Sequence, residues 1–516
     1  MNHADVETQP FLQRDDGDVE EPSRPFTGAK RPGRWHCAAP LQAKKPKTIV
    51  LLLALLMFTI VTSGMLIMMP LFRLVEDTVC HRYYKKDPSE KIDERLCKVD
   101  GVQSELAYLG GWAALIHSSV GLVALLPYGV LADKIGRKPT FILAYIGIIL
   151  AFAWSPFMLA IVQTTNLYLV MMGSLFFLIG GGIPVAMNSL QAMAADVSTE
   201  AEKSTSFLRL SFGAVLGTLV GPFAAGLLME KISPWFPVLL VFAITPVVFA
   251  VLLFIPETLP VKQTPTEEQP GVSEIPKRPL REALAEIRVS LSLLRNRNIS
   301  LAMVTFFIQP ALFAAYSSTM GQYISKYFGW TLAQTSYLLG PPLSLLHLVV
   351  IILVPWISSA LMSPTGRFQL SVFSKDLLLT RVSLLLTIAA AVIEGFSREV
   401  VLFVVGLAIG TLGSANTPLL RAIVTSYVQP DETSRLYSLI SVMDTVGALI
   451  GGPVLAQCFN MGLSRKGLWI GLPWFYVALL VSVAFVALLF LQAPKKLQSE
   501  NETPSRDLDS DEEDIG

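Results

Sequence analysis

The sequence predicts an all-α membrane protein whose twelve transmembrane helices form two six-helix bundles. Three observations predict this fold class: a low content of charged residues, twelve long apolar segments and an internal repeat. Charged residues make up 16% of the 516 residues and hydrophobic residues 52%, whereas soluble domains carry about 25% charged residues. The mean hydropathy is +0.54. A chain of this composition is expected to lie largely within a bilayer.

The first apolar segment, residues 49–72, contains no charged residue. At about 1.5 Å per residue this helix is about 36 Å long, enough to cross a hydrocarbon core of about 30 Å. The residues before it are polar and lack an apolar core, so we expect no cleavable signal peptide and a retained first span at 48–75. Further apolar segments predict eleven more spans, at residues 105–132, 139–161, 166–194, 204–230, 236–256, 298–325, 333–360, 377–394, 399–427, 434–461 and 468–492.

The polar segments divide the chain into five regions. Residues between the sixth and seventh spans are rich in Pro, Glu, Lys and Arg, which is typical of a solvated linker. Lys and Arg gather in the loops on the side of the two chain ends, and this bias predicts that side to be cytosolic. The expected regions are a disordered cytosolic tail (1–47), a first bundle (48–256), a cytosolic linker (257–297), a second bundle (298–493) and an acidic cytosolic tail (494–516).

We expect the protein in the plasma membrane. Residues 7–12 loosely resemble an acidic dileucine sorting signal, so the vacuolar membrane is the alternative.

The long loop at 76–104 contains Cys80 and Cys97 and falls on the non-cytosolic, oxidising side. We predict a disulfide between them, which would constrain the unfolded chain by about 3 kcal/mol. Two free thiols are the alternative. The four cysteines of the chain show no zinc-type spacing, so no metal site is expected.

An internal repeat relates the two sets of six spans. An offset of about 230 residues aligns glycines, charged residues and apolar residues from several spans of the two halves. Because six spans return the chain to the same orientation, the repeat is parallel, and we expect a binding site between the halves near the middle of the membrane. The aligned pairs include Gly136 with Gly366, Gly180 with Gly410, Glu202 with Glu432, Gly217 with Gly447 and Gly221 with Gly451.

Several function classes are excluded. Forty basic and forty acidic residues give a net charge of zero, so there is no basic surplus for nucleic-acid binding. The sequence contains neither a GxxxxGK[ST] phosphate loop nor a GxSxG nucleophile motif. We therefore expect neither an enzyme nor a cofactor.

The loop after the second span reads GVLADKIGRK. Gly129 allows close helix approach, Gly136 permits a tight turn, and Asp133 can pair with a cation or a helix N-terminus. Arg137 and Lys138 would anchor the cytosolic face. The stretch resembles the signature loop of the major facilitator superfamily, and with the span count and the repeat the resemblance covers about residues 48–493. A stray basic loop is the alternative.

This resemblance implies the major facilitator fold and a loop that latches the two halves at the cytosolic end. The corresponding loop of the second half keeps Gly366 and Arg367 but has no Asp. The latch is therefore expected to be one-sided.

The fifth span carries Gly213, Gly217, Gly221 and Pro222, and the glycines follow at four-residue steps. They form one smooth helix face against which a neighbour can pack closely. The pattern resembles the motif associated in the superfamily with drug/proton antiporters. A general packing role is the alternative, since the eleventh span repeats the pattern.

The first loop and the start of the second span, with Cys80, Cys97, Gln103 and Trp112, resemble a group of fungal superfamily members. These are similar in turn to animal proton-coupled folate-type carriers. Some of the fungal relatives accompany natural-product pathways as exporters, so the resemblance implies export of such a compound.

Asp444 is the deepest acid by this reading, about 15 Å into the eleventh span. A stripe of hydroxyl residues that includes Ser438 and Ser441 runs beside it, as expected of a cavity wall. An acid at this depth needs a partner or a water-filled cavity. We consider proton coupling, a structural pair with a cation, and substrate contact.

His117 and His347 lie near the middle of their spans and are aligned by the repeat. Proton movement is the functional interpretation and a helix-bridging hydrogen bond the alternative. Arg209 and Arg421 lie slightly inside the fifth and tenth spans, where they can gate the pathway, contact an anion or extend to the interface.

Other polar residues of the spans could line the pathway or bridge helices. They are Asn188, Gln191, Gln309, Tyr316, Gln322 and Asn416, with Ser438 and Ser441.

The sequence and the resemblance thus predict a monomeric secondary transporter that exports a small organic molecule, a xenobiotic or a secondary metabolite, by proton-coupled alternating access. The alternatives are a proton-coupled uptake symporter for an organic anion or nutrient, and a membrane sensor that transports nothing.

Overall fold

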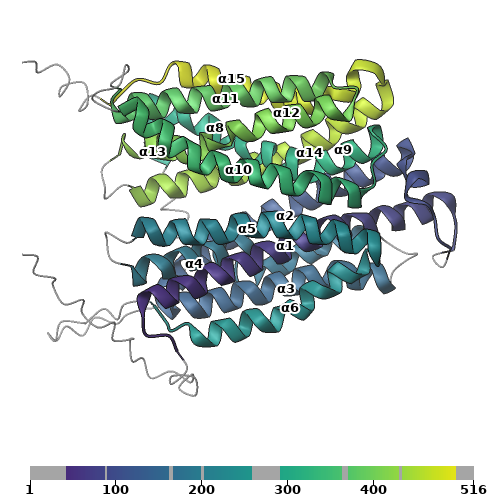
Figure 1. Ribbon diagram of the computed structural model, residues 1–516, viewed down its shortest axis with the longest axis horizontal. Helices are drawn as coiled ribbons and strands as arrows, with labels where there is room; N and C mark the ends of the chain where they lie inside the picture. The colour runs from purple at the N-terminus through teal and green to yellow at the C-terminus, as the bar shows by residue number, and fades with distance from the viewer. Residues whose placement is uncertain are drawn as a thin grey trace, which may run out of the picture.

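The computed structural model describes residues 42–87, 90–161, 167–198, 203–258, 291–362, 370–428 and 433–494, and these are helical almost throughout (Figure 1). Twelve helical segments in these ranges are long and apolar enough to cross a membrane. The all-α fold class and the predicted number of spans are therefore confirmed.

The first bundle contains six spans. The fourth span is made of two helical segments. A short 3₁₀ helix, η2 (Glu94–Lys98), comes directly before the second span, α2. The spans are α1 (Pro46–Tyr84), α2 (Asp100–Ile135), α3 (Arg137–Ile161), η3 (Leu167–Leu178) with α4 (Gly182–Val197), α5 (Lys203–Lys231) and α6 (Trp235–Phe254).

The second bundle contains the seventh to twelfth spans of the chain. The seventh and the tenth are made of three helical segments each. Short 3₁₀ helices precede the seventh span (η4, Leu291–Arg295) and the twelfth span (η8, Gly467–Gly471). The spans are α8 (Arg297–Ala314) with η5 (Ala315–Thr319) and α9 (Met320–Tyr327), α10 (Leu332–Met362), α11 (Val372–Phe396), α12 (Val400–Leu412) with η6 (Gly413–Ala415) and α13 (Asn416–Thr425), α14 (Thr433–Arg465) and α15 (Leu472–Leu489).

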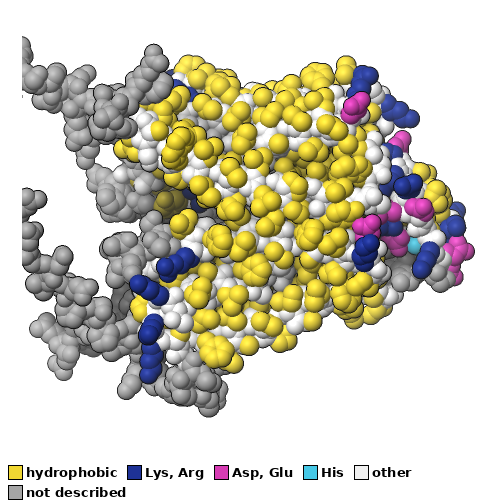
Figure 2. All heavy atoms as spheres, viewed as in Figure 1, with side chains coloured by type: hydrophobic (Ala, Val, Ile, Leu, Met, Phe, Trp, Pro, Cys, Tyr) yellow, Lys and Arg dark blue, Asp and Glu magenta, His cyan; other side chains and the backbone are white. Residues whose placement is uncertain are grey.

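The two bundles lie side by side (Figure 1). Residues 42 and 494, where the described chain begins and ends, lie at one end, which we call the terminal end. The loop with Cys80 and Cys97 lies at the other, which we call the disulfide end. Hydrophobic side chains cover the face between the two ends, and charged side chains gather at the ends (Figure 2), as expected of a protein that spans a bilayer.

α1 is longer than the sequence predicts. It continues to Tyr84, nine residues beyond the expected end of the first span, and its 39 residues make a helix of about 58 Å. Much of the predicted loop is therefore helical, with Cys80 in the last turns of α1 and Cys97 in η2.

Three spans that the sequence predicts as unbroken helices are interrupted. In the fourth, Gly180, Gly181 and Gly182 follow one another with φ values of 87°, 82° and 67°, a conformation that only glycine adopts readily. A π-helix, η5, interrupts the seventh span, and the 3₁₀ turn η6 interrupts the tenth. Irregular backbone at this depth is tolerated only where protein buries it or where it lines a cavity.

The glycine face of α5 packs against α1. A Cβ added at Gly213 would lie 2.4 Å from the Ala54 carbonyl oxygen, and one at Gly217 would lie 2.9 Å from Val61 Cβ. In the second bundle, Gly447 of α14 packs in the same way against the Phe307 carbonyl of α8. The aligned glycines of the repeat thus hold equivalent helix pairs together.

Candidate functional site

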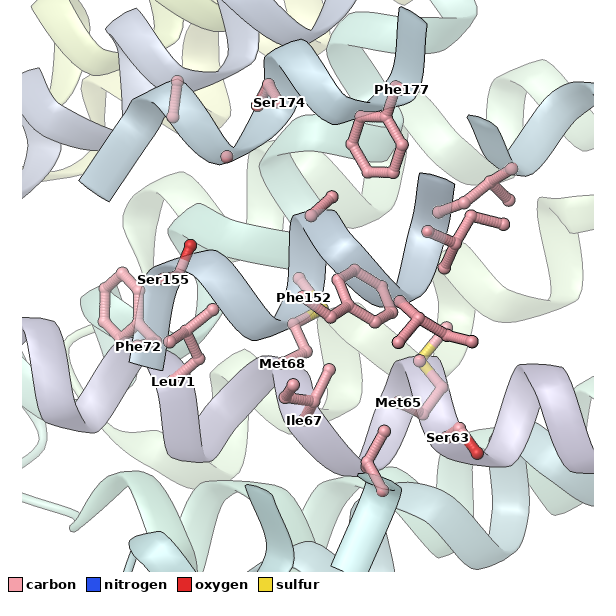
Figure 3. A pocket seen from close by; sticks show the side chains of 18 of the residues that line it. Ser63, Met65, Ile67, Met68, Leu71, Phe72, Phe152, Ser155, Ser174 and Phe177 are labelled. Atoms are coloured by element: carbon pink, nitrogen blue, oxygen red, sulfur yellow. The ribbon is translucent and has the colours of Figure 1, made fainter. Parts of the chain in front are cut away.

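A cavity of 560 Å³ lies within the first bundle, between α1, α2, α3, η3, α4 and α6 (Figure 3). The second bundle contributes only Phe313 of α8 to its described lining. This cavity therefore lies in the first half, whereas the sequence predicts a binding site between the halves. The volume is within the range of about 300 to 1,000 Å³ typical of small-molecule pockets.

The cavity wall is almost wholly apolar, with no Lys, Arg, His, Asp or Glu among its described lining residues. A few hydroxyl groups interrupt it. Ser155 donates to the Val170 carbonyl at 3.3 Å and Thr245 to the Val241 carbonyl at 3.2 Å, whereas the buried Ser63 Oγ has no partner among the described atoms. Ser63 is thus free to bind a polar group of an otherwise apolar molecule.

Polar contacts join the two halves at the disulfide end. Lys326 Nζ of α9 lies 2.6 Å from Asp100 Oδ1 of α2. The Leu332 amide, which opens α10, donates to Glu94 Oε1 of η2 at 2.8 Å. Gln322, predicted as a lining residue, is buried here and donates to the Gln103 carbonyl at 2.7 Å. These contacts close the disulfide end, and we call them the disulfide-end gate.

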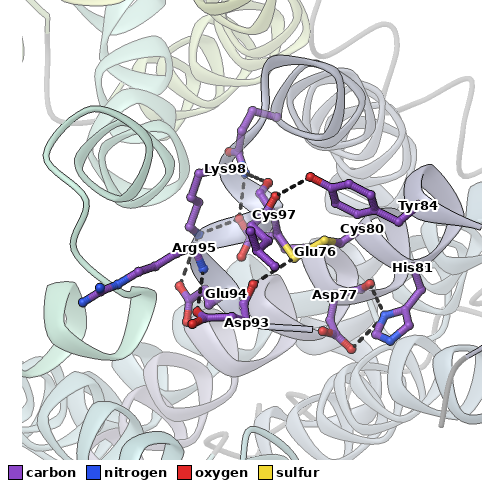
Figure 4. Close-up of a disulfide and its surroundings, with 12 residues drawn as sticks. Glu76, Asp77, Cys80, His81, Tyr84, Asp93, Glu94, Arg95, Cys97 and Lys98 are labelled. Atoms are coloured by element: carbon purple, nitrogen blue, oxygen red, sulfur yellow. Dashed lines mark hydrogen bonds and ion pairs between the residues drawn. A yellow bond between two sulfur atoms is a disulfide. The ribbon is translucent and has the colours of Figure 1, made fainter. Parts of the chain in front are cut away.

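Glu76 organises the first-half side of this gate (Figure 4). Its side chain is only 1% exposed, but Lys98 Nζ (2.6 Å), Gln103 Nε2 (2.7 Å) and Arg73 Nη1 (3.3 Å) all reach its carboxylate. A buried carboxylate is tolerated where donors surround it in this way. Glu76 was not identified as a buried acid from the sequence, because it falls at the start of the predicted loop at 76–104.

A disulfide between Cys80 and Cys97 ties the end of α1 to η2, beside Glu76 (Figure 4). Both cysteines are fully buried. The bond holds Glu94 and Lys98, which lie on the same short helix as Cys97, against the end of α1.

Pro222 creates a second set of contacts between the halves, along α5 and α10. Because proline has no N–H, the Thr218 carbonyl one turn earlier lacks its usual helical donor. Ser344 of α10 supplies a hydroxyl to that carbonyl at 3.0 Å. Ser336, two turns earlier in α10, donates to the Pro222 carbonyl itself at 2.7 Å.

The halves separate toward the terminal end. The ribbons of the two bundles diverge there (Figure 1). The polar contacts described above run from Lys326 and Asp100 at the disulfide end to Ser344 and Thr218 near the middle of α10 and α5. These contacts therefore close the disulfide end, and none of them lies at the terminal end.

Asp444 and Arg421 face each other across α14 and α13, with Oδ2 and Nη2 4.0 Å apart. Their side chains are 34% and 47% exposed. Asp444 is thus a partly exposed acid with a cationic partner in its own half, and it is not the most deeply buried acid of the described chain.

The other predicted coupling residues are dispersed. His117 packs edge-on against Phe177, a cavity-lining residue, with ring centroids 5.0 Å apart. His347 is half-buried on α10, and Arg209 is exposed on α5. The structure does not bring these residues together with Asp444.

None of the predicted lining residues belongs to the described wall of the cavity. Asn188 and Gln191 are exposed on α4, and Gln309 is half-buried on α8. Ser441 bonds back to the Tyr437 carbonyl, and the buried Asn416 accepts from Thr417. The side chain of Ser438 lies outside the described part, and Tyr316 bonds to Glu394.

Glu394 is a second buried acid, besides Glu76, that was not identified from the sequence. It lies in α11, and none of its surface is exposed. It falls at the very end of the predicted ninth span, whereas α11 continues to Phe396. Glu394 is buried because α12 packs against it. The sequence pattern of one span does not predict which neighbouring helix packs on it.

The family described as Major Facilitator Superfamily matches residues 106–392. The chain belongs to the major facilitator superfamily. The MFS efflux pump atnC of Emericella nidulans is 28% identical, over 90% of this chain and 92% of the relative. The MFS-type transporter aprT of Aspergillus flavus is 27% identical, over 93% and 95%. The efflux pump ustT of the same species is 25% identical, over 83% and 85%.

Solved superfamily structures share the fold. The nucleoside transporter NupG aligns with a TM-score of 0.58 at 14% identity, over 87% of this chain and all of that chain. The human organic anion transporter MFSD10 aligns with a TM-score of 0.54 at 16% identity, over 86% and 99%. At these identities the similarity concerns the fold alone.

In the signature loop of the superfamily, the described contacts begin at Gly136, directly after α2. Gly136 has a φ of 111°, and Glu257, just after α6, accepts from the Arg137 amide at 2.9 Å and the Lys138 amide at 3.2 Å. Arg137 Nε also lies 3.6 Å from Asp196 Oδ2 at the end of α4. These contacts fasten the loop to its own half. The side chain of Asp133 and the burial of Gly129 lie outside the described part.

Proposed function

We propose that this superfamily member is a secondary active exporter that moves a small, largely apolar organic molecule by alternating access. The observation that carries the proposal is the apolar cavity of 560 Å³ in a molecule whose two halves are joined by polar contacts at the disulfide end. Cargo enters from the terminal end. The halves then close at the terminal end and separate at the disulfide end, where the cargo leaves.

The orientation follows from charge and redox chemistry. The loops and tails of the terminal end carry most of the Lys and Arg, and by the positive-inside rule this supports a cytosolic location for that end. A disulfide is typical of an oxidising compartment, so the Cys80–Cys97 bond supports a location of the disulfide end outside the cytosol. We propose a plasma-membrane monomer with both chain ends in the cytosol, and the vacuolar membrane remains the alternative.

Export is favoured by the relatives that are named efflux pumps and match most of this chain. The alternative, uptake of an organic anion, requires cationic groups at the site. The described cavity wall has none, so a neutral or weakly polar cargo suits it better. We propose protons as the coupling ion.

Cavity occlusion tests the proposal. Gly64 lines the cavity, and a Cβ at this position meets nothing within 4 Å, so Gly64→Leu fills the cavity without disturbing the backbone. Gly121→Leu is the matched control, because Gly121 also has open space around it but lies outside the described cavity wall.

Cells preloaded with Nile red, a neutral apolar dye, provide the assay. Native chain and Gly121→Leu should clear the dye at least about tenfold faster than Gly64→Leu. Equal rates for the two glycine variants would contradict the cavity's role, and no acceleration by the native chain would contradict export of apolar molecules.

A further inference from the structure

Glu76 and Glu394 are both buried, but their surroundings differ. Glu76 has two cationic groups and an amide on its carboxylate. Glu394 receives a single hydrogen bond, from the Tyr316 hydroxyl to Oε2 at 3.0 Å, and its Oε1 has no partner among the described atoms. The chain thus supplies the donors that a charged carboxylate needs at one position and withholds them at the other.

The surroundings of Glu394 contain no described cation. Two titratable groups face its carboxyl, Tyr316 of η5 and Tyr323 of α9. Gly406 of α12 packs on the aliphatic part of the side chain, where a Cβ would lie 2.8 Å from Glu394 Cγ. The ring of Trp474 packs against Tyr316, and its buried Nε1 has no partner among the described atoms. The rings of Trp474 and Phe403 pack against Tyr323 and close the cluster.

Tyr316 connects this acid to the centre of the molecule. It lies in the π-helix η5, an element found frequently at functional sites. Its side chain is only half-buried, and its hydroxyl lies 3.9 Å from the Cβ position of Gly410 in α12. Phe313, the one residue of the second half in the described cavity wall, lies three residues earlier in the same span. A cargo that displaces Phe313 therefore acts within one turn of Tyr316.

We propose that Glu394 binds and releases a proton during the transport cycle, and that Tyr316 is the positioning residue that couples this step to the occupied cavity. The inference rests on the proposed function. Water takes the proton from the Oε1–H bond in one state and returns a proton to Oε1 in the other, so one proton is exchanged per cycle. Asp444, which is partly exposed and paired with Arg421, is the competing candidate.

Infrared spectroscopy tests proton binding without requiring transport. The purified full-length chain is titrated with acid, and the carbonyl stretch of protonated carboxylic acids is followed. Glu394→Gln should remove one band from the native difference spectrum, and Tyr316→Phe should shift that band because its hydrogen bond is lost. Glu76→Gln is the control and should leave the band in place. Spectra of Glu394→Gln and Tyr316→Phe identical to the native spectrum would overturn the proposal.

Transport measurements then test the coupling role. In vesicles with an imposed proton gradient, Glu394→Gln should lose at least about tenfold of gradient-driven Nile red accumulation while passive exchange of the dye through the protein continues. Tyr316→Phe should shift the pH profile and retain part of the accumulation.

If Glu394→Gln still concentrates the dye and Asp444→Asn does not, the coupling role belongs to Asp444 and our proposal is wrong. If the native chain shows the infrared band but no gradient-driven transport, the proposed function fails, and with it the coupling role of Glu394.

Discussion

Lys326 Nζ lies 2.6 Å from Asp100 Oδ1 and joins the seventh span in one half of the molecule to the second span in the other. The lysine is 14% exposed and also donates to the Lys98 carbonyl beside it. Since the two residues belong to different bundles, their contact exists only while the disulfide end is closed. The Lys326–Asp100 pair is thus one contact of the disulfide-end gate that a single substitution can remove.

We predict that Lys326→Met opens the disulfide end more often. A partly buried charge pair of this kind contributes on the order of 1 kcal/mol, so the open fraction should rise about fivefold. Labelling of Ala333→Cys by a membrane-impermeant maleimide measures this, because Ala333 packs against Gly226 of the other half. Lys86→Met, which breaks the exposed Lys86–Glu90 pair within one loop, should leave the labelling unchanged. Equal labelling in all three backgrounds would contradict a gating role.

The Cys80–Cys97 disulfide should be both protected and stabilising. We predict that neither cysteine reacts with the impermeant maleimide until a reductant is added. Replacement of both by serine should lower the free energy of unfolding by about 3 kcal/mol and lower the melting temperature of the purified chain. Labelling of either cysteine without reduction would show that the bond is absent in the native protein.

Pro222 and Ser344 should be energetically coupled. Ser344→Ala leaves the Thr218 carbonyl without its donor, at a cost of about 1 kcal/mol to the closed state. In a Pro222→Ala background residue 222 regains its N–H and can bond that carbonyl within α5, so Ser344→Ala should then cost much less. A double-mutant cycle on the maleimide labelling rate measures the difference. Ser359→Ala, which removes an exposed bond within α10, is the control, and simple additivity of the two changes would refute this explanation.

The glycine face of α5 should tolerate no larger side chain. Gly217→Leu would force a side chain into α1, where a Cβ already lies 2.9 Å from Val61. We expect a loss of at least about 1 to 3 kcal/mol, seen as reduced yield and a lower melting temperature. Gly121→Leu, with open space around it, should be nearly neutral. A stable Gly217→Leu protein would mean that α1 and α5 are not held this closely.

Features that depend on local pattern could be predicted from the sequence. The twelve spans follow from apolar length, and the smooth face at Gly213, Gly217 and Gly221 follows from four-residue spacing. The pairing of Cys80 with Cys97 required only that both lie in one oxidising loop, and the structure contains that bond.

Features that depend on packing between spans could not. Glu394 and Glu76 fall at the edges of predicted spans, and only the neighbouring helices determine that one is left nearly unpaired and the other fully paired. Gly180, Gly181 and Gly182 lie inside an apolar segment that the sequence predicts as one helix. Their positive φ values interrupt that helix, and residue spacing carries no information on φ. The cavity is lined by residues of six helical segments of the first half, and the sequence does not specify how these segments pack against one another.

The most direct test of proton-coupled export is proton-driven movement of cargo in inside-out plasma-membrane vesicles from cells that express the native chain. The vesicle lumen corresponds to the cell exterior, so an acidic lumen drives protons out through the exporter and cargo in. We predict that acidified vesicles concentrate Nile red several-fold above vesicles with Gly64→Leu, and that an ionophore which collapses the gradient abolishes the difference. Loss of dye from acidified vesicles, or equal accumulation by the native and Gly64→Leu proteins, would contradict the proposed proton-coupled export.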